Sequence, residues 1–487
     1  MNRSEPYLVE RPDEVRRRWD RCPPAGLSRA HTPDWHLERW KLVRDLIDGW
    51  YADDRPDAEA VPDLVERLAG WLDPVQRLVT ERLFAGWRAM FPPEPRLVVE
   101  PDPGAVSVFD HDRRVELRVG TTFGFIRPDG TQERVRLRTG RGSTGPDDAA
   151  VLHQGAEDDA VYLDAMVAMG VAEEIVEPPA AASRVGEVLK LAVRDRRVGV
   201  SPGLWCFGCD SAARCAQYPV VGEGRVYVST RSVTVSKTQL GMLAVCGRRV
   251  AWDRLHQIPT DTDGETELRD GLATGLRFHE MAAAAIPGDD PSAVVAAALS
   301  EAPPSEAAEL GRLWENHLRV WRLDGDPQAR SVEYSAGLTL LVPGIHVDSR
   351  GRESTQPVAV TFIGVLDVTG READGTPMVV EHRTGASGAH GHLEADLYAA
   401  AAAASIQAST RSWPQRLAVH LHHLSPEPPT CVRRVFERAD LDAAVEALRE
   451  AASTIAGWHP HDALSPPWTA GPWCGACHHR PLCETFR

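Results

Sequence analysis

Apolar residues recur at helical spacing through the first 95 residues of the chain. The stretches HLERWKLVRDLIDGW and VPDLVERLAGWLDPVQRLVTERLFAGWRAMF place them three and four positions apart, which predicts helices. Segments from RLVVE to FGFIRPDGTQERVRLR follow and predict strands, with PDG as a hairpin turn. Residues 158–200 have a helical pattern again. The pattern therefore predicts helices, then a sheet, then further helices.

The same order of features occurs a second time along the chain. DGTQERVRLRTG at 129–140 aligns without gaps to DGTPMVVEHRTG at 374–385, and each is followed by a tryptophan and a C-x₂-C-x₅-C pattern. The shared order and the identical cysteine spacing indicate two copies of one domain, 1–222 and 223–487. A chance match between short turn sequences is the alternative.

The bulk composition places the chain among ordinary globular proteins. It has 487 residues, enough for two or three domains, with 43% hydrophobic and 25% charged residues. No apolar run reaches the length of a membrane span, and the N-terminal sequence lacks the apolar core of a signal peptide. We therefore expect a cytoplasmic protein with no membrane partner. Its thiols would stay reduced, so clustered cysteines are better read as metal ligands than as disulfides.

Eight of the nine cysteines fit one rule, in which a lone cysteine early in each copy joins the trio at its end. The first set is Cys22, Cys206, Cys209 and Cys215, and the second is Cys246, Cys474, Cys477 and Cys483. Zinc and a [4Fe–4S] cluster both accept four thiolates, and His478 or His479 offers zinc an alternative ligand. Cys431 falls outside the rule and is expected in the core.

A pair of carboxylates lies between the cysteines of the second set. Asp367 belongs to one apolar strand and Glu381 to the next, and the polar turn READG joins the two strands. Adjacent strands bring such side chains together, and carboxylate oxygens are the ligands that Mg²⁺ and Mn²⁺ prefer. The sequence therefore predicts a divalent-metal site that could act on a phosphate.

Residues 230–487 resemble the PD-(D/E)XK nuclease superfamily, in its RecB-like and AddB-like branch with an iron–sulfur cluster. The matched positions are Ser236, Leu240, Cys246, Gly275, His279, Gly364, Asp367, Glu381 through Gly385, Glu394, Tyr398 and the final cysteine trio. The resemblance implies an α/β (α+β) fold with a restriction-endonuclease-like mixed sheet flanked by helices. It implies a [4Fe–4S] cluster rather than zinc. It also implies a metal held by His279, Asp367 and Glu381, with Arg383, Glu394 and Tyr398 lining the site.

Two positions depart from the family's pattern. Arg383 stands where the family has lysine, and Glu394 where it has glutamine. Arginine keeps the charge but is a wide planar fork, so it does not simply replace a lysine that positions the attacking water. One interpretation is drift in a chain that has only three lysines, Lys41, Lys190 and Lys237. The other is a decayed or repurposed site.

The first copy lacks the carboxylate pair, because Arg136 aligns with Glu381. Its strands carry a row of arginines that could form a cationic track for DNA, although the chain's net charge of −16 opposes a broad nucleic-acid surface. The row consists of Arg134, Arg136, Arg138 and Arg141. A solvated sheet face balanced by nearby acids is the alternative.

Two functions compete on these observations. The first is a metal-dependent deoxyribonuclease acting on single-stranded DNA or DNA ends, in repair or in defence against foreign DNA. The second is a catalytically inactive tandem iron–sulfur scaffold that binds DNA or a helicase subunit. The chain has no G-x-x-x-x-G-K-[ST] loop, so we expect any ATP-driven translocation to come from a partner.

Overall fold

A computed structural model describes most of the chain. The described residues are 8–12, 15–16, 34–52, 61–91, 98–100, 104–127, 129–139, 144–156, 160–193, 212–215, 217–227, 230–258, 266–286, 291–323, 328–347, 352–384, 392–425, 428–475 and 477–486. They form two compact units. Unit 1 comprises residues 1–201, 256–261 and 461–464, and unit 2 comprises 202–255, 262–460 and 465–487. The sequence predicted a boundary at residue 222.

Among its described elements, unit 1 has three helices after the short strand β1, and then strands together with two further helices. Its elements are β1 (Leu8–Glu10), α2 (Asp34–Ala52), α3 (Val61–Ala69), α4 (Pro74–Met90), β2 (Val98–Glu100), β3 (Ala105–Asp110), β4 (Val115–Gly120), β5 (Phe123–Ile126), β6 (Gln132–Arg138), α5 (Pro146–Gly155), β7 (Val161–Met166), β8 (Val171–Glu174) and α6 (Ala181–Val193). Strands β1, β4 and β3 form a small sheet, and β2, β5, β6, β7 and β8 form a larger one.

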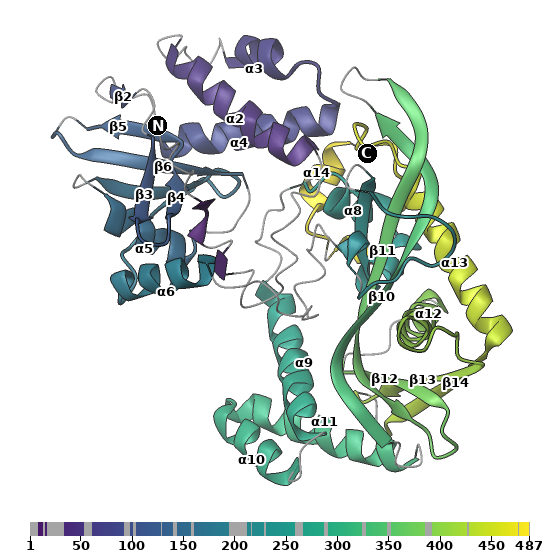
Figure 1. Ribbon diagram of the computed structural model, residues 1–487. Coiled ribbons are helices and arrows are strands. Elements are labelled where there is room, and N and C mark those ends of the chain that lie inside the picture. The colour runs from purple at the N-terminus through teal and green to yellow at the C-terminus, as the bar shows by residue number, and fades with distance from the viewer. Residues whose placement is uncertain are drawn as a thin grey trace, which may run out of the picture. The chain divides into compact units, whose positions relative to one another are not determined.

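Unit 2 holds the longest strands of the chain (Figure 1). Its elements are η3 (Ala212–Arg214), β9 (Arg231–Ser236), α7 (Lys237–Leu243), α8 (Gly247–Arg254), α9 (Thr266–Ala285), α10 (Pro291–Glu301), α11 (Pro304–Leu323), β10 (Gln328–Val347), β11 (Glu353–Arg371), β12 (Pro377–Arg383), α12 (His392–Thr410), β13 (Arg416–His423), β14 (Thr430–Glu437), α13 (Arg438–Ala456), η4 (Pro472–Cys474) and α14 (Arg480–Thr485). No described helix has the length and apolar character needed to cross a membrane.

The sheet of unit 2 runs in the order β10-β11-β12-β13-β14, and β9 pairs with β11. Neighbours are antiparallel except β12 with β13 and β9 with β11, which are parallel. The parallel pair β12 and β13 is joined by the crossover helix α12, as such pairs require. The mixed α/β fold predicted from the sequence is thereby confirmed.

A run of alanines lets α12 pack closely on this sheet. Residues 399–404 are all alanine and all buried, in one core with the apolar side chains of β9, β10, β11 and α13. Small side chains allow the helix backbone to approach the strands, and Figure 1 shows α12 lying against the curved β10–β11 ribbon. A second core forms between α9, α10 and α11 and extends to Leu424. The sheet's β12–β14 end therefore lies close to two helical layers.

The larger sheet of unit 1 has the same sequence of pairings as that of unit 2. Strands β2, β5 and β6 are antiparallel neighbours, β6 and β7 are parallel, and β7 and β8 are antiparallel. Helix α5 crosses between β6 and β7, as α12 crosses between β12 and β13. The two aligned sequence segments thus form β6 and β12, which are strands at equivalent positions in the two sheets.

The turns before these two strands are also built alike. The Asp129 carboxylate accepts a hydrogen bond of 2.9 Å from the backbone N–H of Thr131. The Asp374 carboxylate accepts one of 2.9 Å from the N–H of Thr376. The glycine between each pair has a positive φ, 87° in the first turn and 85° in the second, which glycine adopts without steric cost. The hairpin turn predicted at PDG is confirmed at its described residues, Asp129 and Gly130, which lie between the antiparallel strands β5 and β6.

The helical pattern predicted for residues 158–200 is wrong over its first half. Strands β7 and β8 occupy 161–166 and 171–174, and only 181–193 is helical within the described part of this range. The run VYLDAM pairs with β6 and is largely buried on both faces, so its apolar residues lack the clean alternation of a half-exposed strand.

Candidate functional site

The two predicted carboxylates meet at the junction of β11 and β12. The ladder between these strands runs from Arg371↔Pro377 to Val368↔Val380, so Asp367 and Glu381 are next in register. There the strands part, and the backbone N–H of His382 donates to Asp367 Oδ2 at 2.6 Å instead. Both carboxylates are buried, with relative exposures of 7% for Asp367 and 2% for Glu381. The structure therefore brings this pair together as predicted.

His279 reaches the same place from α9. Its Nδ1 lies 3.2 Å from Asp367 Oδ1. Burial alone would raise the pKa of Asp367, but the hydrogen bond and the charge of His279 lower that pKa to about 2. Burial would lower the pKa of His279, and the contact with Asp367 raises it above its usual value. The contact thus favours the charged form of each group over the neutral form.

Glycine at position 275 allows α9 to come this close. A Cβ there would lie 2.9 Å from Thr384 Oγ1, just past the end of β12. A Cβ almost never lies this close to another heavy atom, so a larger residue would require the Thr384 side chain or α9 to shift. The glycine of the G-x-x-x-H spacing therefore permits a close approach of α9 to the end of β12, one turn before His279.

Lys237 is a member of the site that the sequence did not predict. It begins α7 directly after β9, whose Ser236 pairs with Ile363 of β11. Its ammonium forms an ion pair with Glu381 Oε1. Burial lowers the pKa of Lys237, but Glu381 and Asp367 outweigh that effect and raise it, so the side chain stays charged. A signal was present, because Lys237 is one of three lysines and follows Ser236 of the family motif.

The surroundings of Glu381 disfavour the charged form of its carboxyl group. Burial, followed by repulsion from Asp367, raises its pKa to about 7 despite the attraction of Lys237. Its Oε2 is buried and has no hydrogen-bond partner among the described residues. Buried carboxylate oxygens are rarely left unsatisfied, and hard divalent cations bind oxygen ligands of this kind. The side chains present thus fit a Mg²⁺ or Mn²⁺ ion.

The two residues that depart from the family's pattern, Arg383 and Glu394, form an ion pair with each other. Arg383 Nη2 lies 2.6 Å from Glu394 Oε2. The hydroxyl of Tyr398 donates to Glu394 Oε1 at 3.1 Å, and its ring packs against Gly364. Arg383 and Glu394 are both mostly buried, at 11% and 12% side-chain exposure. The guanidinium is therefore held on Glu394, whereas the ammonium of Lys237 is held on Glu381.

Glu333 is the second member that the sequence did not reveal. In the β10–β11 ladder Val332 faces Val368 and Tyr334 faces Leu366, so Glu333 stands opposite Asp367. Its carboxylate lies 3.9 Å from His279 Nδ1, and burial together with Asp367 raises its pKa. Its φ of 48° is in the left-handed region, which is uncommon for residues other than glycine. Such local strain clusters at functional sites.

The four cysteines of the second set belong to two segments that are tied together. The N–H of Arg248, in the first turn of α8 after Cys246, donates to Pro467 O at 2.8 Å. Asp253 Oδ1, further along α8, contacts His478 Nε2 at 2.9 Å and His479 Nε2 at 2.8 Å. Burial raises the pKa of the Cys477 thiol, and the neighbouring thiols of Cys246 and Cys483 add to it. Cys246 and Cys483 thus lie near enough to Cys477 to affect its charge.

The predicted residues of the first copy are only partly described. Cys22, Cys206, Cys209 and Arg141 lie outside the described residues. Cys215 packs beside Ala212, Tyr218 and Ile363, within unit 2. Cys431 packs at the α9–α11 core, as predicted.

Two of the predicted arginines have acidic partners inside unit 1. Arg136 Nη2 lies 3.1 Å from Asp148, and Arg138 Nε lies 3.3 Å from Asp164. Both guanidinium groups also donate to Thr144 Oγ1. Burial lowers the pKa of Arg136, which is only 13% exposed. Arg134 is half-buried on the same strand.

Comparison with known proteins identifies a family whose sequence model matches this chain. A sequence model of the PD-(D/E)XK nuclease superfamily matches residues 234–484. No curated protein matches the chain. Among solved structures, the crystal structure of SSO0001 is 15% identical, with 52% of this chain and 86% of that chain covered and a TM-score of 0.22. A likeness of that size supports no argument about function.

Proposed function

Because the chain belongs to the PD-(D/E)XK nuclease superfamily, we propose that unit 2 is a divalent-metal-dependent deoxyribonuclease. The proposed substrate is single-stranded DNA or DNA ends, in repair or in defence against foreign DNA. The observation that carries the proposal is the convergence of Asp367, Glu381 and the Lys237 ammonium beside His279. Acids, a lysine and a histidine at one strand junction form a site suited to phosphodiester hydrolysis.

Asp367 and Glu381 would hold Mg²⁺ or Mn²⁺, with His279 as a further ligand. The bound ion supplies a Lewis acid that polarises a phosphate oxygen and lowers the pKa of a water molecule. Asp367 is already ionised, and Glu381 presents an oxygen without a described hydrogen-bond partner. Glu333 lies opposite Asp367 and adds a third acid, whose pKa is raised by burial and by Asp367.

Lys237 would take the place that the resemblance assigns to residue 383. Its charge is opposite Glu381 and its raised pKa keeps it protonated, so it can donate to a water or a phosphate oxygen. Arg383 is instead bonded to Glu394, which Tyr398 also contacts. We therefore assign Arg383, Glu394 and Tyr398 to the wall of the site, where they orient α12 against β12.

The second set of cysteines would hold a [4Fe–4S] cluster, with zinc as the alternative. Cys246 precedes α8, while Cys474, Cys477 and Cys483 end the chain, and the described contacts tie the two segments together. The Nε2 atoms of His478 and His479 both contact Asp253. These contacts favour the four thiols, rather than the two histidines, as the metal ligands. In this role the cluster fastens both ends of the unit and takes no part in hydrolysis.

Unit 1 would be a second copy of the fold that has lost its acids. The equal order of strand pairings and the matching turns before β6 and β12 support this proposal. It would bind DNA or a partner such as a helicase subunit. The partners found for Arg136 and Arg138 favour the interpretation in which acids balance part of the arginine row.

A catalytically inactive scaffold is the second candidate function. The observation that favours it is the pairing of Arg383 with Glu394, which leaves no lysine at the family's position. Purified protein incubated with end-labelled single-stranded DNA and Mn²⁺ separates the two candidates. We expect cleavage by the wild type and none by Asp367→Ala. Cleavage that persists unchanged in Asp367→Ala would sink the nuclease assignment, and an inert wild type that still binds DNA would favour the scaffold.

A further inference from the structure

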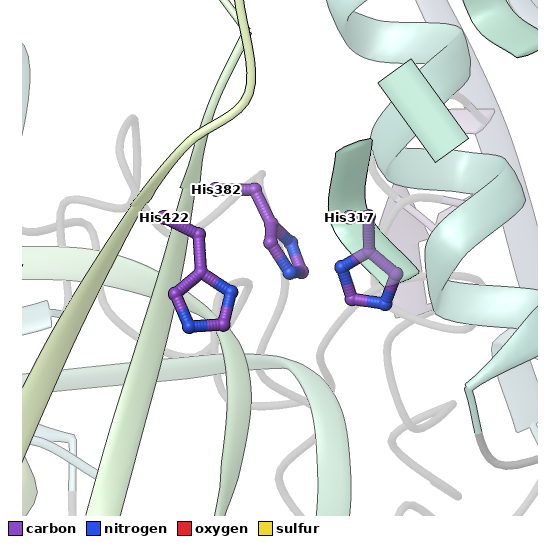
Figure 2. Close-up of side chains that lie close together, drawn as sticks. All are labelled: His317, His382 and His422. Carbon is purple, nitrogen blue, oxygen red and sulfur yellow. The ribbon is translucent and has the colours of Figure 1, made fainter. Parts of the chain in front are cut away.

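Three histidines meet on the side of β12 away from Glu381. His382 belongs to β12, His422 to β13 and His317 to α11, and Figure 2 shows the rings gathered with His382 in the middle. The ring centroids are 4.9 Å apart for His317 and His382, and 5.7 Å apart for His382 and His422. All three are buried. Successive strand residues point to opposite faces, so His382 lies across β12 from Glu381, although its Nδ1 is 3.6 Å from Asp367 Oδ2.

The strand pair β12–β13 positions two of these histidines, and helix α11 positions the third. His382 and His422 are partners in the parallel register of β12 and β13, which places their side chains next to each other on one face. Helix α11 is anchored to the chain just beyond β13. The amide of Asn316 donates to Leu424 O at 2.8 Å, which holds the neighbouring His317 above the strand pair. The cluster thus arises from regular structure rather than from a loop.

Buried ring nitrogens of His317 and His382 lack the hydrogen-bond partners that buried polar groups usually have, within the described part of the chain. Burial, and repulsion from His422, lowers the pKa of His317 to about 3. Nδ1 of His317 and both ring nitrogens of His382 have no hydrogen-bond partner among the described residues. Each unsatisfied buried polar group costs about 1–3 kcal/mol, so a ligand that bonds to these nitrogens would stabilise the unit.

We propose that His317, His382 and His422 bind a transition-metal ion, Zn²⁺ in the first place. One ring nitrogen of each lies within 4.8 Å of the others, so small side-chain rotations bring them to one centre. Neutral imidazole is the form that binds metal, and it suits zinc, whereas Mg²⁺ and Ca²⁺ prefer oxygen. The choice of ion follows from this all-nitrogen donor set.

The surroundings match a metal site that is closed to solvent. The His317 ring stacks on Trp314 at 5.0 Å and lies 5.2 Å from Trp321, and Phe278 lies 5.7 Å from His382. Nδ1 of His382 is 3.6 Å from Asp367 Oδ2, which gives this ring a carboxylate on its outer side. Metal-binding histidines regularly have such a carboxylate behind them, because it orients the ring and strengthens its donor nitrogen.

Metal content tests the proposal without any assay of activity. Full-length protein is stripped with chelator, then equilibrated with Zn²⁺ in the presence of millimolar Mg²⁺, which occupies oxygen-rich sites. We expect His317→Gln and His422→Gln each to bind one zinc fewer per chain than the wild type, by elemental analysis. His423→Gln, on the next residue of β13, is the matched control and should bind as much zinc as the wild type. Equal zinc in all four proteins would overturn the site.

A second measurement covers variants that fail to fold. Stripped wild-type protein is loaded with Co²⁺ under the same conditions. We expect the visible absorption of cobalt bound to nitrogen ligands, in addition to any near-ultraviolet thiolate bands from the cysteine set. The melting temperature should rise on adding the metal. Cobalt that binds with oxygen-only or thiolate spectra alone, or a melting temperature unchanged by metal, would contradict the proposal whatever the nuclease assay gives.

Discussion

At the scale of the residue, Lys237 contacts Glu381 from a position 144 residues earlier in the chain. If it supplies the charge at the phosphate, Lys237→Met should lower the cleavage rate by about 10²–10³, the usual cost of one transition-state donor. Lys237→Arg should retain part of the rate. Lys190→Met removes an exposed lysine of α6 and is the control. A Lys237→Met enzyme as fast as the wild type would show that the charge acts from elsewhere. Steady-state cleavage with Mn²⁺ is the measurement.

Arg383 and Glu394 form a mutual pair at 2.6 Å, so the two departures from the family should depend on each other. Glu394→Gln alone leaves the mostly buried Arg383 without its counter-charge, and Arg383→Lys alone replaces the planar guanidinium with a compact ammonium that does not reproduce its contact with Glu394. The double variant restores the family's lysine and glutamine. We expect the double variant to be more stable than the sum of the single effects allows, with a coupling of about 1–3 kcal/mol in urea unfolding. Additive effects would mean that the pair contributes nothing.

Glu333 combines a left-handed backbone with a carboxylate in the site. Glu333→Ala removes the carboxylate but keeps the strain, whereas Glu333→Gly removes both. We expect the glycine variant to be more stable than the alanine variant by about 1 kcal/mol, because a positive φ costs other residues that much. Both should lose cleavage activity. Thermal unfolding compares the two, and an alanine variant as stable as the glycine variant would show that the strain is negligible.

At the scale of the element, Asp253 ties α8 to the chain's final turn through His478 and His479. Burial would raise the pKa of Asp253, but hydrogen bonds from the two histidines hold it below the ordinary value of 3.8. A carboxyl whose folded pKa is depressed stabilises the fold above its unfolded pKa and loses that effect as pH falls further. Asp253→Asn should therefore be less stable at neutral pH, by about 1–3 kcal/mol. The gap to the wild type should close only below pH 3.8.

Unfolding curves at several pH values measure this gap directly. The conservative substitution keeps the size of the side chain, so packing changes little. A gap that stays constant down to the most acid pH would show that Asp253 contributes through shape and not through its charge.

The sequence revealed contacts within one element or between elements joined by a short turn, but not contacts that depend on long-range pairing. Asp367 and Glu381 were predictable as neighbours because a short turn joins β11 and β12. Lys237 and Glu333 were not, since the first depends on the parallel pairing of β9 with β11 and the second on an irregularity of the β10–β11 ladder. The role of Arg383 depends on which acid its guanidinium meets, and spacing carries no such information. Buried strand β7 was mistaken for helix because it lacks alternation.

At the scale of the whole molecule, the cysteine set joins α8 to the end of the chain. Anaerobically purified protein should be brown, with about four irons for each [4Fe–4S] cluster. Cys246→Ser and Cys474→Ser should each lose the iron of unit 2 and lower the melting temperature alike. Cys431→Ser, which packs at the α9–α11 core, is the control and should keep its iron. A colourless protein with zinc would overturn the cluster, and iron retained in Cys246→Ser would place the fourth ligand elsewhere.

The scarcity of lysine gives the ion pair of Lys237 and Glu381 a practical consequence. The other two lysines, Lys41 on α2 and Lys190 on α6, are exposed. Amine-specific acylation requires a deprotonated amine, and the raised pKa of Lys237 together with its contact to Glu381 opposes that reaction. Mass spectrometry of the acylated chain would thus record the state of the site as a count of modified lysines. A third modified lysine would show that the ammonium of Lys237 has left the carboxylate of Glu381.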